Sequence, residues 1–420
     1  MSILKKILRE SLDFDSIFKM PFISVIKKNG GEVVIVGGSV RDKFLGKDSK
    51  DIDLLCRGID MNKLISILEK YGRTDLVGKS FGVIKFIPDG YDLDEPIDIA
   101  LPRTERPLTD FEKDEAEKKT GKRPKGYQAF TTDSDHNLSI KDDLLRRDFT
   151  INASTVTSDG DLYDPFNGKE DLDNKIIRMV SPQSFSDDPL RILRGIQFAS
   201  RFGFNIEKNT WEEMKKNSSK IRGISGERIL IELEKIIKKG DPMIGFKLLM
   251  DSGVYDVIFG THFTKFIGDV SLIKKSKTLS EFIYSIVQDS VKDISKIHIE
   301  RLRGTIDTAR EIDCLELAWN NKNTSILNSR LTAYKIYKTT VKGFNLQLYP
   351  SNISKAINDL KSKYPKSMSE LEINGNDLME LGLRGKEIAE AFNNIFIEIY
   401  SDKLKNKKID IINYLKKTNK

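Results

Sequence analysis

A pair of glycines after an apolar segment could bring backbone amide groups close to a bound phosphate. Val33–Val36 contains only β-branched residues and predicts a strand that ends at Gly37 and Gly38. Residues Ser39–Leu45 favour a short helix, whose first amides would point at an anion while Arg41 adds a charged donor. The pair is neither the spaced-glycine dinucleotide motif nor a P-loop. Taken alone, a tight turn that binds nothing is the alternative.

Two carboxylates shortly after this turn are candidates for a metal site. Asp51 and Asp53 are separated by one residue, so on a strand both side chains would point to the same face. Hard cations such as Mg²⁺ prefer oxygen ligands and keep substrate phosphates as further ligands. The alternative is a solvated pair at a strand edge or a helix N-cap. Next to the glycine turn the metal interpretation is favoured, and Asp98 is a candidate third carboxylate.

A second polar block occupies residues 142–153. It contains Arg146 and Arg147, followed by Asp148 and Asn152. Adjacent arginines offer donors for phosphates, and the aspartate offers an acceptor for a ribose hydroxyl. A surface ion-pair network is the alternative explanation for the same composition.

A third block combines an aspartate with two arginines on one side of a predicted helix, Leu190–Phe202. Asp188, Arg191 and Arg194 are three positions apart, and Pro189 fits the first helical turn beside an aspartate N-cap. A carboxylate only accepts and a guanidinium only donates hydrogen bonds. Such a pair matches the amino donor and ring-nitrogen acceptor of cytosine and adenine, and it mismatches uracil and guanine. An i,i+3 salt bridge is the alternative.

The elements that must position these blocks change character along the chain. Strand-like segments occur before about residue 165, with a helical pattern between them, and from Asp187 onward the pattern is almost entirely helical. Residues 103–137 interrupt this order as a long charged segment, which predicts a functional or mobile loop. We therefore expect an α+β fold, a mixed sheet followed by helical domains. The segments are Val33–Val36, Met61–Lys70, Phe81–Ile87, Ile97–Leu101, Leu190–Phe202, Arg228–Lys238 and Pro242–Met250.

Bulk properties exclude several classes of protein. The 420 residues, 39% of them hydrophobic, predict about two to four folded domains. A net charge of +7 favours nucleic acid only slightly. There is no membrane-spanning apolar run and no signal-peptide pattern, so we expect a cytoplasmic protein. Two cysteines give no disulfide framework, and three scattered histidines argue against a zinc site or a metal-dependent phosphohydrolase.

In this order, the blocks resemble the motifs of the class II tRNA nucleotidyltransferase and bacterial poly(A) polymerase family. The motifs are GG-x-x-R-D with D-x-D, R-R-D-F-T-x-N-A and E-D-x-x-R, and Gly226–Leu233 is similar to the neck-helix motif. The match covers roughly residues 30–260. Two departures are Asp187 in place of the family's glutamate and Gln197 in place of a further arginine.

The resemblance implies a polymerase-β-like nucleotidyltransferase head with a helical neck, body and tail. The expected divisions are a helical extension (1–20), the catalytic head (21–165), the neck with the base-recognition helix (166–265) and an RNA-binding body and tail (266–420). By the same resemblance, Gly38 and Arg41 would bind the triphosphate, and Asp51 and Asp53 would bind Mg²⁺ and serve in catalysis. Arg147 and Asp148 would contact the phosphate and sugar of the nucleotide. Asp188 and Arg191 would be the template for the base, with Arg194 supporting that site.

The implied reaction is template-independent transfer of CMP and AMP from CTP and ATP to the 3′ end of tRNA, with release of pyrophosphate. A poly(A) polymerase is the first alternative, although Val77–Gly82 departs from the run that such enzymes tend to carry. Addition of only CC or only A is the second, and the long 103–137 segment argues weakly against CC alone. An RNA-binding protein on an inactive scaffold is the third. The sequence leaves the oligomeric state open.

Overall fold

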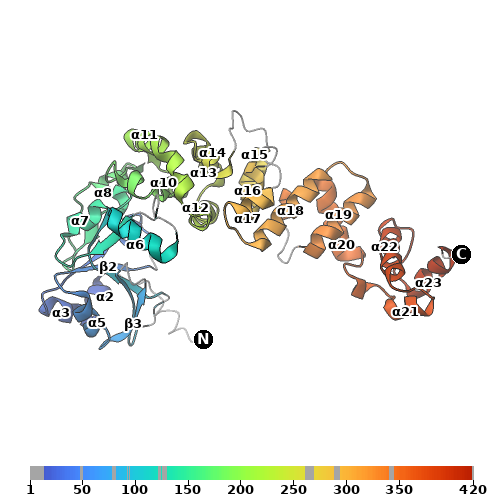
Figure 1. Cartoon of the computed structure of the whole chain (residues 1–420), viewed down its shortest axis with the longest axis horizontal. Helices are drawn as coiled ribbons and strands as arrows, with labels where there is room; N and C mark the ends of the chain where they lie inside the picture. Colours follow the sequence, from blue (N-terminus) through green and yellow to red (C-terminus); the bar gives the residue numbers. More distant parts are fainter. Residues whose placement is uncertain are drawn as a thin grey trace. The chain divides into compact units, whose positions relative to one another are not determined.

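The computed structural model divides into two compact units (Figure 1). The first comprises residues 1–232 and 239–260, and the second comprises 233–238 and 261–420. The residues described are 14–47, 51–77, 82–91, 93, 95–121, 124, 130–260, 269–287, 294–339 and 345–418. Parts of the expected N-terminal extension and of the Val77–Gly82 stretch, and the expected boundary at 265, lie outside them. The four predicted domain limits stay predictions.

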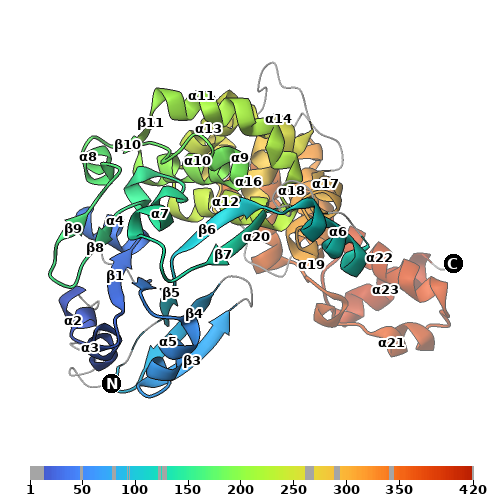
Figure 2. The same cartoon turned by 60° about the vertical axis from the view of Figure 1, so that its left-hand side comes forward.

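The first unit is built on a seven-stranded sheet of order β3-β4-β5-β2-β1-β8-β9 (Figure 2). Strands β2 and β5 pair in parallel and the other neighbours pair antiparallel, which confirms the predicted mixed sheet. The strands are β1 Glu32–Val36, β2 Asp53–Arg57, β3 Gly72–Val77, β4 Val83–Pro88, β5 Ile97–Ala100, β8 Thr155–Val156 and β9 Leu162–Tyr163.

One face of this sheet forms the main core of the unit. Side chains such as Leu54, Ile97 and Ile99 pack there with residues of α3 Pro21–Lys28 and α5 Met61–Leu68. Burial of each large apolar side chain stabilises the fold by about 1.5–3 kcal/mol. Because successive side chains of a strand alternate between faces, the residues next to these three point to the opposite face. The strand pattern therefore directs Asp53 and Asp98 away from the core.

Helices form most of the rest of the first unit, together with short two-stranded sheets such as β10 Ile176–Ile177 paired with β11 Asn205–Ile206. These helices are α2 Phe14–Phe18, α4 Gly38–Phe44, α7 Ile140–Leu145, α8 Gly168–Asp173, α9 Ser184–Asp187, α10 Leu190–Phe202, α11 Lys208–Asn217, α12 Gly226–Lys239, α13 Pro242–Asp251 and α14 Val254–Phe259. Residues 233–238 of helix α12 are assigned to the second unit. The predicted bounds of α10 are confirmed. It begins directly after Pro189, and the Asp188 carboxylate accepts the Leu190 amide at 3.1 Å.

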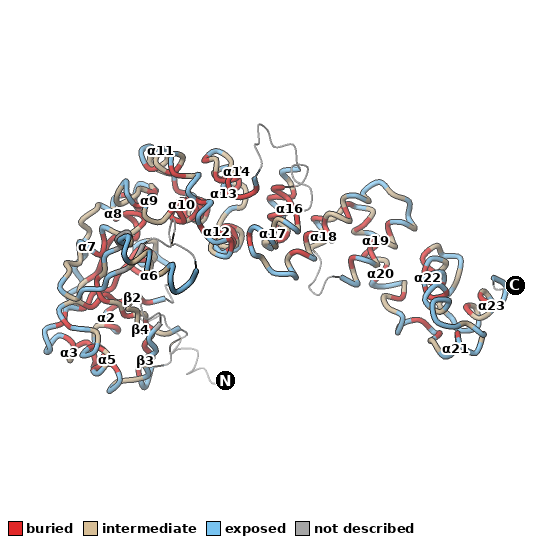
Figure 3. Tube along the Cα trace, in the orientation of Figure 1, coloured by how far each residue is buried: buried red, intermediate tan, exposed pale blue. Residues whose placement is uncertain are grey.

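The segment 103–137 is not the loop that we expected. Strands β6 Arg103–Pro107 and β7 Phe130–Ser134 pair antiparallel and flank helix α6 Asp110–Thr120 (Figure 2). A capping box between Thr109 and Glu112 starts the helix, yet none of its residues is buried (Figure 3). The loop prediction was wrong because this helix has no apolar face whose periodicity could identify it.

The second unit is helical throughout its described residues, as the sequence predicts. Two apolar clusters hold its C-terminal half together, one around Ile395 and Tyr400 and one around Ala333 and Ile357. No described helix of the chain is long and apolar enough to cross a membrane. The helices are α15 Val270–Lys275, α16 Leu279–Val287, α17 Ile294–Glu300, α18 Ile306–Asn320, α19 Ile326–Thr339, α20 Ser351–Lys363, α21 Gly375–Glu380, α22 Lys386–Tyr400 and α23 Lys408–Thr418.

Candidate active site

The glycine turn meets the second polar block at Gly37. This residue has φ of 77°, a conformation that side chains with a Cβ rarely adopt. A Cβ built there would lie 2.8 Å from Nη1 of Arg147 and 3.6 Å from Oδ2 of Asp53. Glycine is therefore required both for the turn and for the close approach of a guanidinium and a carboxylate. Gly38 follows as the first residue of α4.

The two predicted metal carboxylates lie at the start of β2. The strand begins at Asp53, which is half-buried, and Asp51 precedes it in an exposed position, so only one of the two belongs to the expected strand. Burial raises the pKa of Asp53, Arg147 opposes the shift, and the nearby carboxylates Asp98 and Asp51 add to it. Several negative charges thus converge at this end of the sheet.

The donor set here fits a hard divalent cation. Carboxylate oxygens are the ligands that such ions prefer, and a cation would relieve the repulsion between neighbouring carboxylates. Asp98 instead forms an ion pair of 2.9 Å with Lys85. Within the described residues, no three acidic, histidine or cysteine side chains are grouped so that they could hold a metal ion. Asp51 and Asp53 would therefore share a cation with substrate phosphates.

Arg147 is held beside the turn by a buried aspartate. Asp143 is fully buried and forms ion pairs with Arg146 at 2.7 Å and with Arg147 at 3.1 Å. Burial opposes ionisation of Asp143, but the two arginines outweigh it and lower its pKa. The sequence analysis gave Asp143 no role. Asp143 lies on α7, three and four residues before Arg146 and Arg147, and this spacing is typical of ion pairs at helical positions.

Asp148 is the centre of a buried hydrogen-bond network. Its Oδ2 accepts from Nε of Arg194 at 2.7 Å, and Nη2 of the same ion pair also lies 2.7 Å away. Its Oδ1 accepts from Asn152 Nδ2 at 3.0 Å and from the Phe149 amide at 2.8 Å. Burial opposes ionisation, but Arg194, Asn152 and Arg191 overcome it and lower the pKa of Asp148 to about 2. This network connects the second block to the third.

Arg41 extends the network back to the glycine turn. Its Nη1 donates to Asn152 Oδ1 at 2.7 Å, its Nε donates to Asp42 at 2.8 Å, and the guanidinium lies over the rings of Phe198 and Phe202. The whole residue is 5% exposed, so its burial is nearly complete. Helix α4 is thereby fixed to α10. Asn152 and Asp42 are the links that sequence reasoning did not assign, although both lie within the motifs.

The two predicted base-recognition residues contact different protein groups. Asp188 Oδ2 accepts from Arg228 Nη2 at 3.0 Å, and Arg191 Nη1 donates to Ser184 Oγ at 3.0 Å. Arg228, on α12, was not among the predicted site residues, although it lies in the motif at 226–233. The contacts of Asp188 and Arg191 hold both side chains in place at the start of α10, and their role toward a base remains a prediction.

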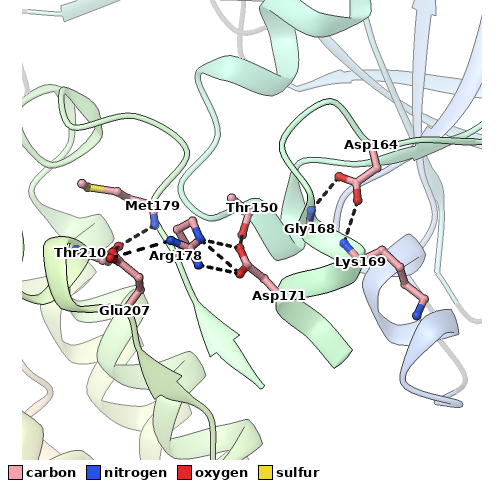
Figure 4. Close-up of polar contacts among 9 residues, drawn as sticks. All are labelled: Thr150, Asp164, Gly168, Lys169, Asp171, Arg178, Met179, Glu207 and Thr210. Atoms are coloured by element: carbon pink, nitrogen blue, oxygen red, sulfur yellow. Dashed lines mark hydrogen bonds and ion pairs between the residues drawn. The ribbon is translucent and has the colours of Figure 1, made fainter. Parts of the chain in front are cut away.

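A second network supports the turn that carries Asp148 and Asn152 (Figure 4). Asp171 accepts from Thr150 Oγ1 at 2.6 Å and from Arg178 Nε at 3.0 Å. A bridge between Phe149 and Met179 ties the same turn to the segment after β10 Ile176–Ile177. Asp171 is 4% exposed, so the turn is anchored from its buried side.

Two family models match parts of this chain. Residues 33–178 match the family model described as the poly A polymerase head domain. Residues 203–264 match the model described as a probable RNA and SrmB-binding site of polymerase A. The first match contains the glycine turn, both aspartates and the Asp148 block.

Among curated relatives, a CCA-adding enzyme of Actinobacillus succinogenes is 39% identical over 224 residues, 52% of this chain and 49% of the relative. The chain thus spans about half the length of the first relatives that it matches. A CCA-adding enzyme of Bacillus pumilus is 27% identical over 94% of this chain and 96% of the relative.

Solved structures share the fold over nearly the whole chain. The CCA-adding enzyme of Bacillus stearothermophilus in complex with CTP has a TM-score of 0.71 and 20% identity, covering 97% of this chain and 98% of that one. The Thermotoga maritima CCA-adding enzyme complexed with tRNA has a TM-score of 0.66 and 23% identity, with full coverage of both chains. These likenesses confirm the polymerase-β-like head and the helical remainder.

Proposed function

We propose that this chain, which belongs to the tRNA nucleotidyltransferase and poly(A) polymerase family, adds CMP and AMP to the 3′ end of tRNA from CTP and ATP. The observation that carries the proposal is the meeting of Asp53 and Arg147 at Gly37, with Arg41, Asn152 and Asp148 continuing to Arg194. This geometry supports a cation, a triphosphate and a sugar side by side. Relatives of similar sequence are named CCA-adding enzymes.

Asp51 and Asp53 would hold Mg²⁺ in this proposal. Bound there, the ion would activate the RNA 3′-hydroxyl and stabilise the charge on the leaving pyrophosphate. The positions of the reacting groups and the surrounding charge account for most of the catalysis in phosphoryl transfer, so no covalent enzyme intermediate is needed. Arg147, positioned by Asp143, would contribute its guanidinium to the nucleotide phosphates.

Gly38 and Arg41 would hold the triphosphate, and Asp148 would contact the sugar. Because Arg41 is already bonded to Asp42 and Asn152, its contact with a phosphate would use the part of the guanidinium that faces the turn. A Cβ at Gly38 would lie 3.5 Å from Arg41 Nη2, which places that nitrogen beside the turn. The same nitrogen lies 2.7 Å from Asp42 Oδ1, so a phosphate would share it with this ion pair.

Base choice would fall to Asp188 and Arg191, with Arg194 in support. A carboxylate acceptor next to a guanidinium donor matches cytosine and adenine and rejects uracil and guanine. The bond from Arg228 to Asp188 and the bond from Arg191 to Ser184 would hold the two groups in their orientations.

The proposal places the enzyme in the cytoplasm, where tRNA and nucleoside triphosphates are available. Poly(A) addition is the second candidate activity, because the head matches a model named for poly A polymerase. Addition of only CC or only A is a narrower form of the same reaction.

An extension assay distinguishes these activities. Purified protein receives Mg²⁺ and tRNA transcripts that end before CCA, at CC or with complete CCA, together with each nucleoside triphosphate separately or all four. We expect the first two transcripts to be completed to CCA and the third to stay unchanged. Long adenosine tails on generic RNA would instead establish a poly(A) polymerase. The inactive-scaffold alternative predicts RNA binding without any extension.

A further inference from the structure

The strand register places four charged residues in a row across the sheet. Asp75 on β3 pairs with Lys85 on β4, Lys85 pairs with Asp98 on β5, and Asp98 pairs with Asp53 on β2. Residues paired across neighbouring strands point to the same face of a sheet. In this row Asp98 lies between the predicted metal carboxylate of Asp53 and the ammonium group of Lys85, and Asp75 follows on the far side of Lys85.

Lys85 and Asp98 form an ion pair that can be exchanged. Their charged atoms lie 2.9 Å apart, and the side chains are 42% and 36% exposed. Pairs that are open to water at this level contribute little free energy, so another cation can replace the ammonium. Asp75, in register on the other side of Lys85, offers a second carboxylate to a displaced ammonium.

We propose that Lys85 is a built-in counter-ion that competes with the divalent cation for Asp98. In the free protein Lys85 neutralises Asp98, and the described carboxylates are not grouped as a three-ligand metal site. Arrival of the cation displaces the ammonium, and the Asp98 side chain then moves to join Asp51 and Asp53. This inference rests on the metal site of the proposed function. Lys85 is a positioning residue in this account, because it acts through Asp98.

The local charge supports the exchange. The groups that act electrostatically on Asp53 include the carboxylates Asp51 and Asp98 and the cations Arg147 and Lys85. With Asp53 itself, three negative charges face two positive ones. The net charge of these groups is therefore negative. If Lys85 stayed in place, a bound divalent ion would make it positive, and release of the Lys85 ammonium would bring it back to zero. Lys85 therefore weakens binding of a cation that arrives without nucleotide.

The experiment measures Mn²⁺ binding to the full chain without nucleotide, from the electron paramagnetic resonance signal of free Mn²⁺. We expect Lys85→Met to lower the Mn²⁺ dissociation constant about tenfold, because a competing charge is removed. Lys85→Arg keeps the charge and should stay within about twofold of the parent. Arg57→Met is the matched control, since Arg57 forms an ion pair with Glu32 at the opposite end of β2.

A double variant separates competition at Asp98 from a general change of field. In an Asp98→Asn background, Lys85→Met should shift the dissociation constant by less than about twofold. An equal tenfold effect in both backgrounds would overturn competition at Asp98. So would an unchanged or weaker affinity in the folded Lys85→Met protein, with folding checked by circular dichroism.

Asp53→Asn keeps this test independent of the proposed function. If it weakens Mn²⁺ binding while Lys85→Met does not strengthen it, the metal site stands and the role of Lys85 is wrong. If Asp53→Asn leaves Mn²⁺ binding unchanged, the metal site itself is wrong. If Asp53→Asn weakens binding and Lys85→Met strengthens it, both are supported.

Discussion

Asp53 and Asp148 are two aspartates of one site whose surroundings shift their pKa values in opposite directions. Burial and the neighbouring carboxylates Asp98 and Asp51 raise the pKa of Asp53, although Arg147 opposes them. Around Asp148, donors from Arg194 and Asn152 outweigh burial and lower the pKa to about 2. One carboxylate thus lies among like charges, and the other is satisfied by protein donors.

This difference shows that the Asp148 network and the start of β2 are prepared for a ligand in different ways. The network around Asp148 is complete within the protein and fixes α4 to α10, so it provides a rigid frame. The end of β2 concentrates negative charge, which a cation and its attached phosphates would neutralise. We infer that the frame positions the nucleotide and that the β2 end performs the chemistry.

The largest effect on stability should come from Asp148→Ala. It would leave the Arg194 guanidinium and the Asn152 amide without their carboxylate acceptor. We expect a loss of about 2–4 kcal/mol in the free energy of unfolding, below the range for fully buried pairs because Arg194 is 35% exposed. Urea unfolding measures this loss of stability. Asp173→Ala, which removes a surface ion pair with Lys169, is the control. Equal losses in both variants would contradict the rigid frame.

A smaller loss in the free energy of unfolding should appear when the parent protein is taken to acidic pH. The folded pKa of Asp148, about 2, is depressed below its ordinary value of 3.8. Its stabilisation is therefore complete above about pH 4 and is lost as pH falls toward 2, by about 1–2 kcal/mol. Urea unfolding between these pH values should show a loss of stability that is larger by this amount in the parent than in Asp148→Asn, because other carboxylates such as Asp143 contribute equally in both proteins. The same acid dependence in both proteins would assign it to other carboxylates.

The smallest expected effect is a gain in stability, from removing the charge of Asp53. Because the folded pKa of Asp53 is raised, its ionised form costs stability above the unfolded pKa, and this cost disappears as acid protonates the group. Asp53→Asn should therefore raise the melting temperature of the metal-free protein by about 2–4 °C at neutral pH. Calorimetry in EDTA measures this shift. A lower melting temperature would show that Asp53 is stabilised by its surroundings.

Much of the frame could be predicted from the sequence because its elements have strong local signals. Helix α10 has a regular apolar face and a preceding proline, and its predicted bounds agree with the structure. Strand β1 is a β-branched run that ends at a glycine pair. The order of the three motif blocks predicted that they would form one site. In the structure Asn152 joins the first block to Asp148, and Asp148 joins the third block through Arg194.

The rest depends on contacts that a sequence does not display. Strands β6 and β7 are polar and have no alternating apolar pattern, so their pairing was missed. The register that places Asp98 beside Asp53 is set by the packed sheet, and it cannot be read from either strand. Arg228 reaches Asp188 from another helix, which is also a tertiary contact.

The division between chemistry and base choice is tested most directly by nucleotide competition on tRNA lacking CCA. The ratio of kcat/KM for CTP to that for UTP is measured in the parent and in Asp188→Asn. If the residues at the start of α10 select the base, the ratio should fall about 10- to 100-fold in this variant, because an amide can donate to the uracil carbonyl. An unchanged ratio in Asp188→Asn, with incorporation of both nucleotides reduced equally, would contradict the division.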